Sequence, residues 1–221
     1  LVYLALLICS AFFYAYKPFD FPERTAPFPD ELQGLGFWLR VMLVWQPPLE
    51  LMWIVFLTAL IEWLREGRLA VRLAGAVLGT ALPFVLLILF KQDALSKPAY
   101  ALAAAACAAA LSPLLRRASA EQWRRIASFM LGLNIIGLAA LAPMRLSIWL
   151  DAEGLYKGSQ IAGGLWILGV GTLGLRSLTG LRLPRCFMAL LLSMFLQIAF
   201  AFTLHMLGVV PKEVLKALLY A

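Results

Sequence analysis

Residues 160–210 decide the fold of this chain, because they contain two long apolar runs joined by a short basic turn. The first run reads IAGGLWILGVGTLGL (161–175), the turn RSLTGLRLPR (176–185), and the second run CFMALLLSMFLQIAFAFTLHMLGVV (186–210). A hydrocarbon layer of about 30 Å is crossed by roughly 20 helical residues, so each run, with its flanking residues, predicts one membrane crossing. The turn carries three arginines and no acid, which is typical of a loop that stays in the cytoplasm.

The composition places the whole chain in the same class. Hydrophobic residues make up 63% of the 221 residues and the mean hydropathy is +0.87, whereas soluble domains are about 45–50% apolar. We therefore expect an all-α fold: a polytopic transmembrane helix bundle of six to seven spans with interfacial amphipathic helices, built as one membrane domain over residues 1–221. The net charge of +7 does not indicate nucleic-acid binding. The cations cluster between apolar runs, where anionic lipid headgroups are the expected partner.

The expected elements follow from the alternation of apolar runs, prolines and charges. Residues 1–16 are interpreted as the first span, which is apolar but short. Residues 17–48 are interpreted as an outer or interfacial segment, with four prolines in 17–30 and a half-inserted helix over 31–45. The bundle occupies 49–210, and 211–221 forms an interfacial tail. The spans expected in the bundle before residues 160–210 are 49–64, 73–90, 98–115 and 126–150.

The distribution of cations predicts the orientation of these spans. Three short loops on one side carry the arginines of the chain that lie between spans: Arg65, Arg68, Arg72, Arg116, Arg117, Arg124, Arg125, Arg176, Arg182 and Arg185. The segments expected on the other side are longer and carry fewer cations, mostly lysines. By the positive-inside rule, the N-terminus is cytoplasmic and the C-terminus periplasmic, in what we expect to be a bacterial inner membrane.

Small residues predict where helices approach one another closely. Spacings of three, four and seven residues place glycines on one face of a helix, which lets another helix backbone come near. That helix can belong to this chain or to a partner membrane protein. The helix-packing positions predicted in this way are Gly75, Gly79, Gly164, Gly171 and Gly174. The alanine-rich run 98–115 is only weakly lipophilic, so we expect it inside the bundle rather than facing lipid.

Polar side chains within the apolar runs are the candidates for a functional site, because an ionisable or polar group is costly at membrane depth. The candidates are Glu50, Asn134, Arg145, Gln197 and His205. Glu50 falls in the first turn of the helix expected after Pro48, where the helix dipole favours an anion. The amides can bond a neighbouring helix, the histidine suits the interface, and the arginine can extend to the headgroups. A proton or cation site around Glu50 is the alternative.

A second acid in the same expected helix has a simpler interpretation. Glu62 lies one helical turn before Arg65, close to the surface that carries the arginines. We expect the two to form an interfacial ion pair.

The sequence predicts no catalytic residues, no metal site and no cofactor. Cys9, Cys107 and Cys186 lie in apolar runs without metal-ligand spacing, and the single histidine cannot build a histidine-rich site. No zinc-protease, serine-hydrolase or phosphate-loop motif occurs. A Cys–Arg–His membrane protease of the exosortase type stays an alternative, because Cys107, Arg145 and His205 are present.

The carboxy-terminal half resembles the bacterial branch of the Yip1 family of polytopic membrane proteins. The matching features are GGLWILGVGTLGLRSLTGL (163–181) and RLPRCFMALLLSMFLQ (182–197), and a weaker likeness covers EGRLAVRLAGAVLGTALPFVLL (66–87). The alanine-rich span, the proline–phenylalanine segment and the tail depart from the family's pattern. The resemblance implies a non-enzymatic membrane protein. The positions that match its glycine-leucine-arginine motif and the following turn are Gly174, Leu175, Arg176, Thr179, Gly180 and Leu181.

The sequence as a whole favours a non-catalytic integral membrane protein, acting as a scaffold or accessory subunit packed against other membrane proteins. The first alternative is a small transporter or lipid-handling protein that uses Glu50, Asn134, Gln197 or Arg145 in a path between helices. Prolines inside the expected spans fit this alternative, because transporters use broken helices near their sites. The second alternative is an intramembrane enzyme.

Overall fold

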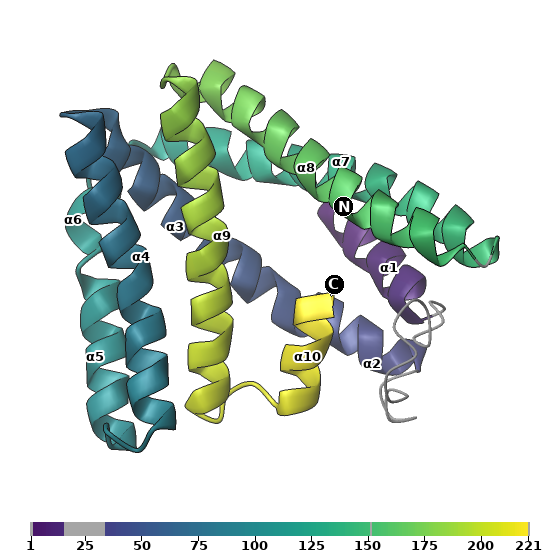
Figure 1. The fold of residues 1–221 in the computed structure, drawn as a ribbon, viewed down its shortest axis with the longest axis horizontal. Helices are drawn as coiled ribbons and strands as arrows, with labels where there is room; N and C mark the ends of the chain where they lie inside the picture. The colour runs from purple at the N-terminus through teal and green to yellow at the C-terminus, as the bar shows by residue number, and fades with distance from the viewer. Residues whose placement is uncertain (1, 16–33, 151, 221) are drawn as a thin grey trace.

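A computed structural model describes residues 2–15, 34–150 and 152–220 of the chain. The regular elements in these ranges are all helices, which confirms the all-α fold (Figure 1). The expected extended segment 17–30 lies outside the described residues. The elements are α1 (Val2–Ala15), α2 (Leu35–Arg40), the π-helical segment η2 (Val41–Trp45), α3 (Gln46–Arg65), α4 (Leu69–Lys91), α5 (Lys97–Ala109), α6 (Ser112–Leu115), α7 (Ala120–Trp149), α8 (Glu153–Thr179), α9 (Leu183–Met206) and α10 (Lys212–Tyr220).

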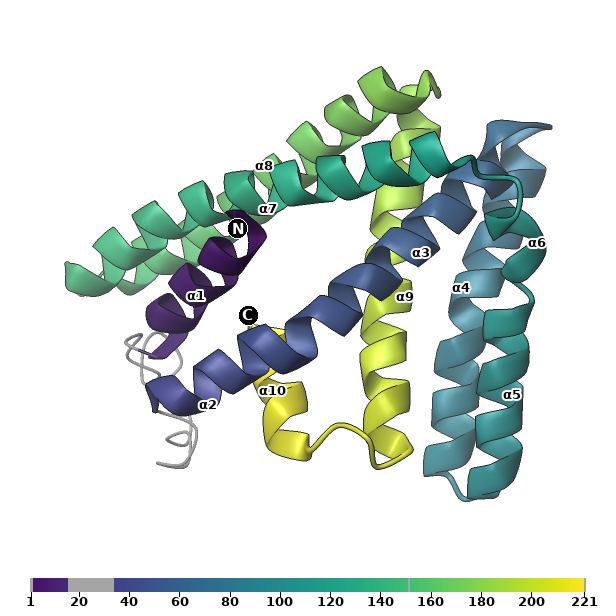
Figure 2. The ribbon, with the colours of Figure 1, turned by 180° about the vertical axis from the view of Figure 1, so that it is seen from behind.

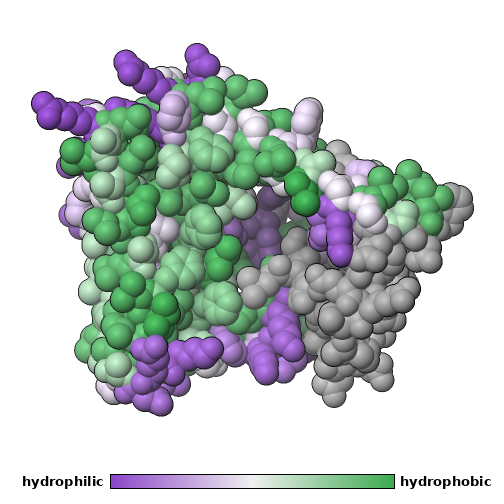
Figure 3. Space-filling model, viewed as in Figure 1, coloured by the Kyte–Doolittle hydropathy of each residue, from purple (hydrophilic) through white to green (hydrophobic). Residues whose placement is uncertain are grey.

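Within the described residues, six helical stretches are long and apolar enough to cross a membrane, which indicates an integral membrane protein. The surface over α4, α5 and α9 is hydrophobic, and hydrophilic residues gather at the ends of these helices (Figure 3). The short helix Val2–Phe12 is apolar but is not among the spans. The six stretches are Leu35–Arg65, Leu69–Lys91, Lys97–Leu115, Ala120–Met144, Gly154–Thr179 and Leu183–Met206.

Helices α3 and α9 form the centre of the bundle. They cross each other, with the antiparallel pair α4–α5 on one side and the long pair α7–α8 on the other (Figures 1 and 2). Their contact is the main apolar core, in which Leu57, Ile61 and Leu190 are buried together. A second core joins α1, α2, η2 and α10 around Trp38. The apolar residues Val214 and Leu215 of α10 are buried in this second core, so the tail packs on the protein itself.

The turn between α8 and α9 is shorter than the expected turn 176–185, because both helices extend into it. Gly180 follows α8 with a φ of +70°, the left-handed conformation that glycine adopts without steric cost at the end of a helix. Pro184 lies in the first turn of α9, where a missing backbone N–H is tolerated. The helix α8 also begins at Glu153, so residues 153–159, which lie between the expected span 126–150 and the apolar run that starts at 161, are helical.

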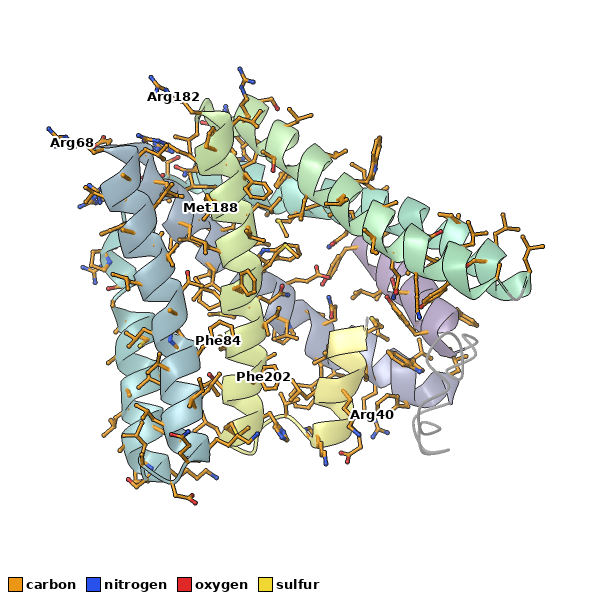
Figure 4. The ribbon with its side chains drawn as sticks, viewed as in Figure 1. Arg40, Arg68, Phe84, Arg182, Met188 and Phe202 are labelled. Carbon is orange, nitrogen blue, oxygen red and sulfur yellow. The ribbon has the colours of Figure 1, made fainter. Side chains whose placement is uncertain are left out.

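The three arginine-bearing turns lie at one end of the molecule. The α3–α4, α6–α7 and α8–α9 connections are found together at the top of Figure 1, and Arg68 and Arg182 both extend from this end in Figure 4. Arg185 joins two of these turns, because its guanidinium donates hydrogen bonds to the carbonyl oxygens of Leu64 (2.6 Å), Arg65 (2.7 Å) and Gly67 (2.8 Å). We call this the arginine end.

The expectation of a separate half-inserted helix over 31–45 is wrong. Residues 35–65 form one continuous helical stretch, in which α2, η2 and α3 follow one another without a break. Pro47 and Pro48 lie inside this stretch, directly after the π-helical segment. Local π-helical adjustment is one way in which a spanning helix accommodates prolines. Glu50 is therefore within a span and not in the first turn of a helix.

The alanine-rich span is the least buried of the six, so the expectation that it lies inside the bundle is wrong. Only 6% of its residues are buried, against 39% for the spans Leu35–Arg65 and Leu183–Met206. It forms α5 and α6 at the outside of the molecule, next to α4 (Figure 1). Alanine favours helix formation, which agrees with the helical structure of this run. Its low lipophilicity did not place the helix in the interior of the bundle.

The predicted packing glycines divide into two groups. A Cβ atom added to Gly75, Gly171 or Gly174 would lie less than 3.0 Å from the side chain of Trp63, Leu190 or Phe129, respectively, so these three are packing positions within the chain. A Cβ on Gly79 or Gly164 would meet nothing within 4 Å. Gly164 is exposed on α8, so a partner helix can reach it, whereas Gly79 borders a cavity.

Candidate functional site

The Glu50 carboxylate lies in the interior of the Leu35–Arg65 span, directly after an irregular part of its backbone. In η2 the N–H of Gln46 bonds the carbonyl of Val41, five residues earlier, which is the π-helical pattern. Pro47 and Pro48 have no N–H and donate no backbone hydrogen bond. A π-helical turn inserted in an α-helix is frequent at functional sites. The irregular backbone thus immediately precedes the acid.

Three neutral donors from three helices surround this carboxylate. Gln46 Nε2 donates to Glu50 Oε1 at 3.1 Å, and Asn134 Nδ2 of α7 donates to Glu50 Oε2 at 3.0 Å. The hydroxyl of Tyr3, on α1, also donates a hydrogen bond to Glu50. We call Tyr3, Gln46, Glu50 and Asn134 the polar centre. It brings together two of the five candidates, Glu50 and Asn134, from positions 84 residues apart.

The ion pairs found in the described part of the chain do not include Glu50. They are Glu62–Arg65, at 2.9 Å, and Glu121–Arg125. The predicted pair Glu62–Arg65 is thus confirmed, and Glu62 also accepts a hydrogen bond of 2.6 Å from Gln122 Nε2. Two acids of one helix therefore have different surroundings. Glu62 has a cation beside it at the arginine end, whereas neutral groups alone hold Glu50 among the contacts described.

Gln197 and His205 have structural contacts elsewhere on α9. Gln197 Nε2 donates to the carbonyl oxygen of Leu49 at 3.4 Å, so it lies next to the polar centre and links α9 to α3. His205 Nδ1 donates to the carbonyl oxygen of Val210 at 2.8 Å, which fixes the connection between α9 and α10. Arg145 is in α7, and its side chain lies outside the described part of the structure.

Cys107 and His205, the members of the alternative Cys–Arg–His set whose side chains are described, do not lie together. The hydroxyl of Tyr100 in α5 donates a hydrogen bond of 2.9 Å to Thr203 Oγ1 in α9. Tyr100 therefore lies beside α9, next to a residue two positions before His205. Cys107 is seven residues further along α5, about 10 Å away at 1.5 Å per residue. In addition, Nδ1 of the His205 imidazole is engaged in the hydrogen bond with the carbonyl oxygen of Val210.

The molecule is hollowed on one face (Figure 3), and Glu50 is not fully buried. The space-filling view shows the molecule hollowed between α8 and the α9–α10 side, with hydrophilic atoms visible inside (Figure 3). Glu50 is half-buried and keeps part of its surface accessible. An accessible carboxylate inside a span can be reached by a small ligand.

Two members of the polar centre, Tyr3 and Gln46, were not among the sequence candidates. A signal existed for Gln46, because it precedes Glu50 by four residues and so shares its helix face. No comparable signal existed for Tyr3, since a tyrosine in an apolar run is ordinary in a membrane protein.

Comparisons with known proteins leave the family open. A scan against models of protein families found no match, and searches of curated proteins and of solved structures found none either.

Proposed function

We propose that this chain is a small, non-catalytic membrane protein that carries a small cation, a proton included, by way of the polar centre. The observation that carries the proposal is the Glu50 carboxylate, which three neutral donors hold inside a span. Ionisable groups inside membranes are rare, and most of them mark ion or proton paths.

The chemistry of the polar centre favours a cation as the ligand. Besides the carboxylate, Gln46 and Asn134 each have an amide oxygen, and Tyr3 has a hydroxyl oxygen. Oxygen atoms of this kind are the ligands that hard cations prefer. A bound cation or proton would also neutralise Glu50, an acid inside a span for which the described contacts show no ion-pair partner.

The backbone around Glu50 favours movement of the ligand over a permanently bound ion. The π-helical segment and the two prolines make the helix irregular just before the acid. Irregular spanning helices that border a water-filled space are typical of transporters.

The test is cation uptake by the purified protein in phospholipid vesicles, followed with a pH-sensitive dye for protons and with potassium- or sodium-sensitive dyes for those ions. With an imposed gradient of protons, potassium or sodium, the wild-type protein should speed uptake of one of them over empty vesicles. Glu50→Gln should lower that rate at least tenfold, because it removes the charge and keeps the shape. Glu62→Gln is the matched control in the same helix and should keep the rate. Equal rates for wild type and Glu50→Gln would contradict the proposal.

A second candidate function is packing against a partner membrane protein, as a scaffold or accessory subunit. The observation that favours it is the open face of α8, where Gly164 has no neighbour within 4 Å and Leu165 and Trp166 are exposed. On this proposal, a partner that co-purifies in mild detergent should be lost from Gly164→Leu, while the folded protein keeps its melting temperature. Retention of the partner would count against this function.

We also propose that the chain is related to the Yip1 family and lies in a bacterial inner membrane. The grouping of the arginine turns at one end supports an orientation with that end in the cytoplasm (Figure 4). The segment around α10 would then face the periplasm, and the cytoplasmic N-terminus stays a prediction.

A further inference from the structure

A second hollow of the molecule lies between α3, α4, α5 and α9, away from the polar centre. It is a cavity of about 510 Å³, within the range of about 300–1,000 Å³ that is usual for small-molecule sites. Its walls are almost entirely apolar, and α5 contributes a row of small side chains, which includes Ala101, Ala104 and Ala108. Glu50 is not among the residues that line it.

One end of this cavity is closed by a hydrogen bond. The hydroxyl of Tyr100 donates to Thr203 Oγ1 at 2.9 Å and thereby joins α5 to α9. The ring of Tyr100 stacks on Phe90 with a centroid separation of 4.6 Å. All three residues lie towards the α4–α5 turn, opposite the arginine end (Figure 1).

The other end of the cavity meets a cation. Trp63 lines the cavity, and Arg72 Cζ lies 4.6 Å from the centroid of its ring. The indole Nε1 donates to the carbonyl oxygen of Arg72 at 2.8 Å, which fixes the ring beneath the guanidinium. Neither ion pair of the described residues includes Arg72. Arg68 is exposed at the arginine end (Figure 4), and Arg116 and Arg117 are exposed directly after α6.

We infer that this cavity holds an acyl chain of an anionic phospholipid, whose phosphate binds Arg72. An apolar cavity lined at one end by Trp63, whose ring lies beneath a guanidinium that is in neither described ion pair, matches a molecule with a hydrocarbon chain and an anionic head. A whole partner helix does not fit, because a helix 10 Å wide and 30 Å long has a volume of about 2,400 Å³, more than the cavity can hold.

The headgroup decides which lipid binds. An acyl chain in the surrounding bilayer is in contact with material as apolar as the cavity wall. The wall alone therefore does not favour one lipid over another. A charge-assisted contact between phosphate and guanidinium supplies the preference, because arginine presents several donors to the phosphate oxygens. The bound lipid therefore has a net negative charge, and a zwitterionic lipid binds more weakly.

The experiment is native mass spectrometry of the purified protein in detergent, with dioleoyl phosphatidylglycerol, dioleoyl phosphatidylcholine and glycerol phosphate as probes. Ala104→Phe fills the cavity, and Ala106→Phe, an exposed alanine of α5 that does not line it, is the matched control. Arg72→Gln removes the cation, and Arg182→Gln removes an exposed cation of the same end (Figure 4). Ala108→Leu replaces Ala104→Phe if the latter does not fold.

Phosphatidylglycerol should bind the wild type at least tenfold more tightly than the other two probes. Ala104→Phe and Arg72→Gln should each weaken that binding at least tenfold, whereas both controls and Glu50→Gln should leave it unchanged. Equal binding of phosphatidylcholine would overturn the role of Arg72. Undiminished binding to the filled-cavity variant, or equally tight binding of glycerol phosphate, would overturn the acyl site.

Discussion

Arg185 shows how much a single side chain contributes to this fold. It begins α9, yet its guanidinium binds the carbonyl oxygens at the end of α3 and in the turn that follows. The last carbonyls of a helix have no partner within the helix and carry partial negative charge. Arg185 satisfies them from a position about 120 residues further along the chain.

We predict that Arg185→Gln lowers the free energy of unfolding by about 2 kcal/mol, the usual value for hydrogen bonds that involve a charged group. The measurement is denaturant unfolding of the protein in detergent, followed by circular dichroism. Arg182→Gln is the control, because Arg182 is exposed in the neighbouring turn. A loss of similar size in the control would show that net charge, and not the bonds of Arg185, is responsible.

The sequence could identify the polar residues of the candidate site but not their arrangement. Glu50 and Asn134 each stand out as polar residues within apolar runs. Their hydrogen bond depends on how α3 packs against α7, which no local pattern predicts. Arg185 was counted among the arginines that face lipid headgroups, because its partners on α3 are remote in the sequence.

At the scale of elements, the helix over 35–65 has the largest effect on the site. Pro47 and Pro48 predict a helix boundary, since proline normally ends or begins a helix. The structure instead continues the helix through them and forms η2 just before them. The span thereby gains length, and Glu50 moves from an expected helix end to the interior of a span.

Helix packing makes the second prediction. A leucine at position 171 must displace Leu190 of α9, because even a Cβ there would lie 2.7 Å from that side chain. We expect Gly171→Leu to destabilise the protein by about 1–3 kcal/mol, the usual cost of overpacking. Gly164→Leu, on the same helix but in open space, should leave stability unchanged.

Thermal melting of both variants in detergent, read by circular dichroism, makes this comparison. A lower melting temperature for Gly164→Leu alone would mean that α8 presents its other face to α9.

The whole molecule has two chemically different ends. The arginine turns gather at one end (Figure 4). Lysines lie at the α4–α5 turn and in α10. The fold class and the number of spans could be predicted from the apolar runs, because helix length is set by bilayer thickness. The positions of the helices around α3 and α9 could not, since apolar runs of similar composition face either lipid or each other.

The orientation of these ends makes the third prediction, and labelling tests it in a variant whose three native cysteines are replaced by serine. Lys212→Cys should react with a membrane-impermeant maleimide in intact cells, because we expect α10 on the outer side. Arg182→Cys should react only after the membrane is opened. The reverse pattern would invert the proposed orientation and leave the fold unaffected.

The carboxy-terminal helix α10 has a mechanical consequence for the polar centre. It turns back from α9 and rests on η2, the irregular part of the helix that carries Glu50. A domain fused after Tyr220 would therefore be tethered to the helix that packs on the backbone next to Glu50. The uptake test proposed above is best made on a protein without such a fusion.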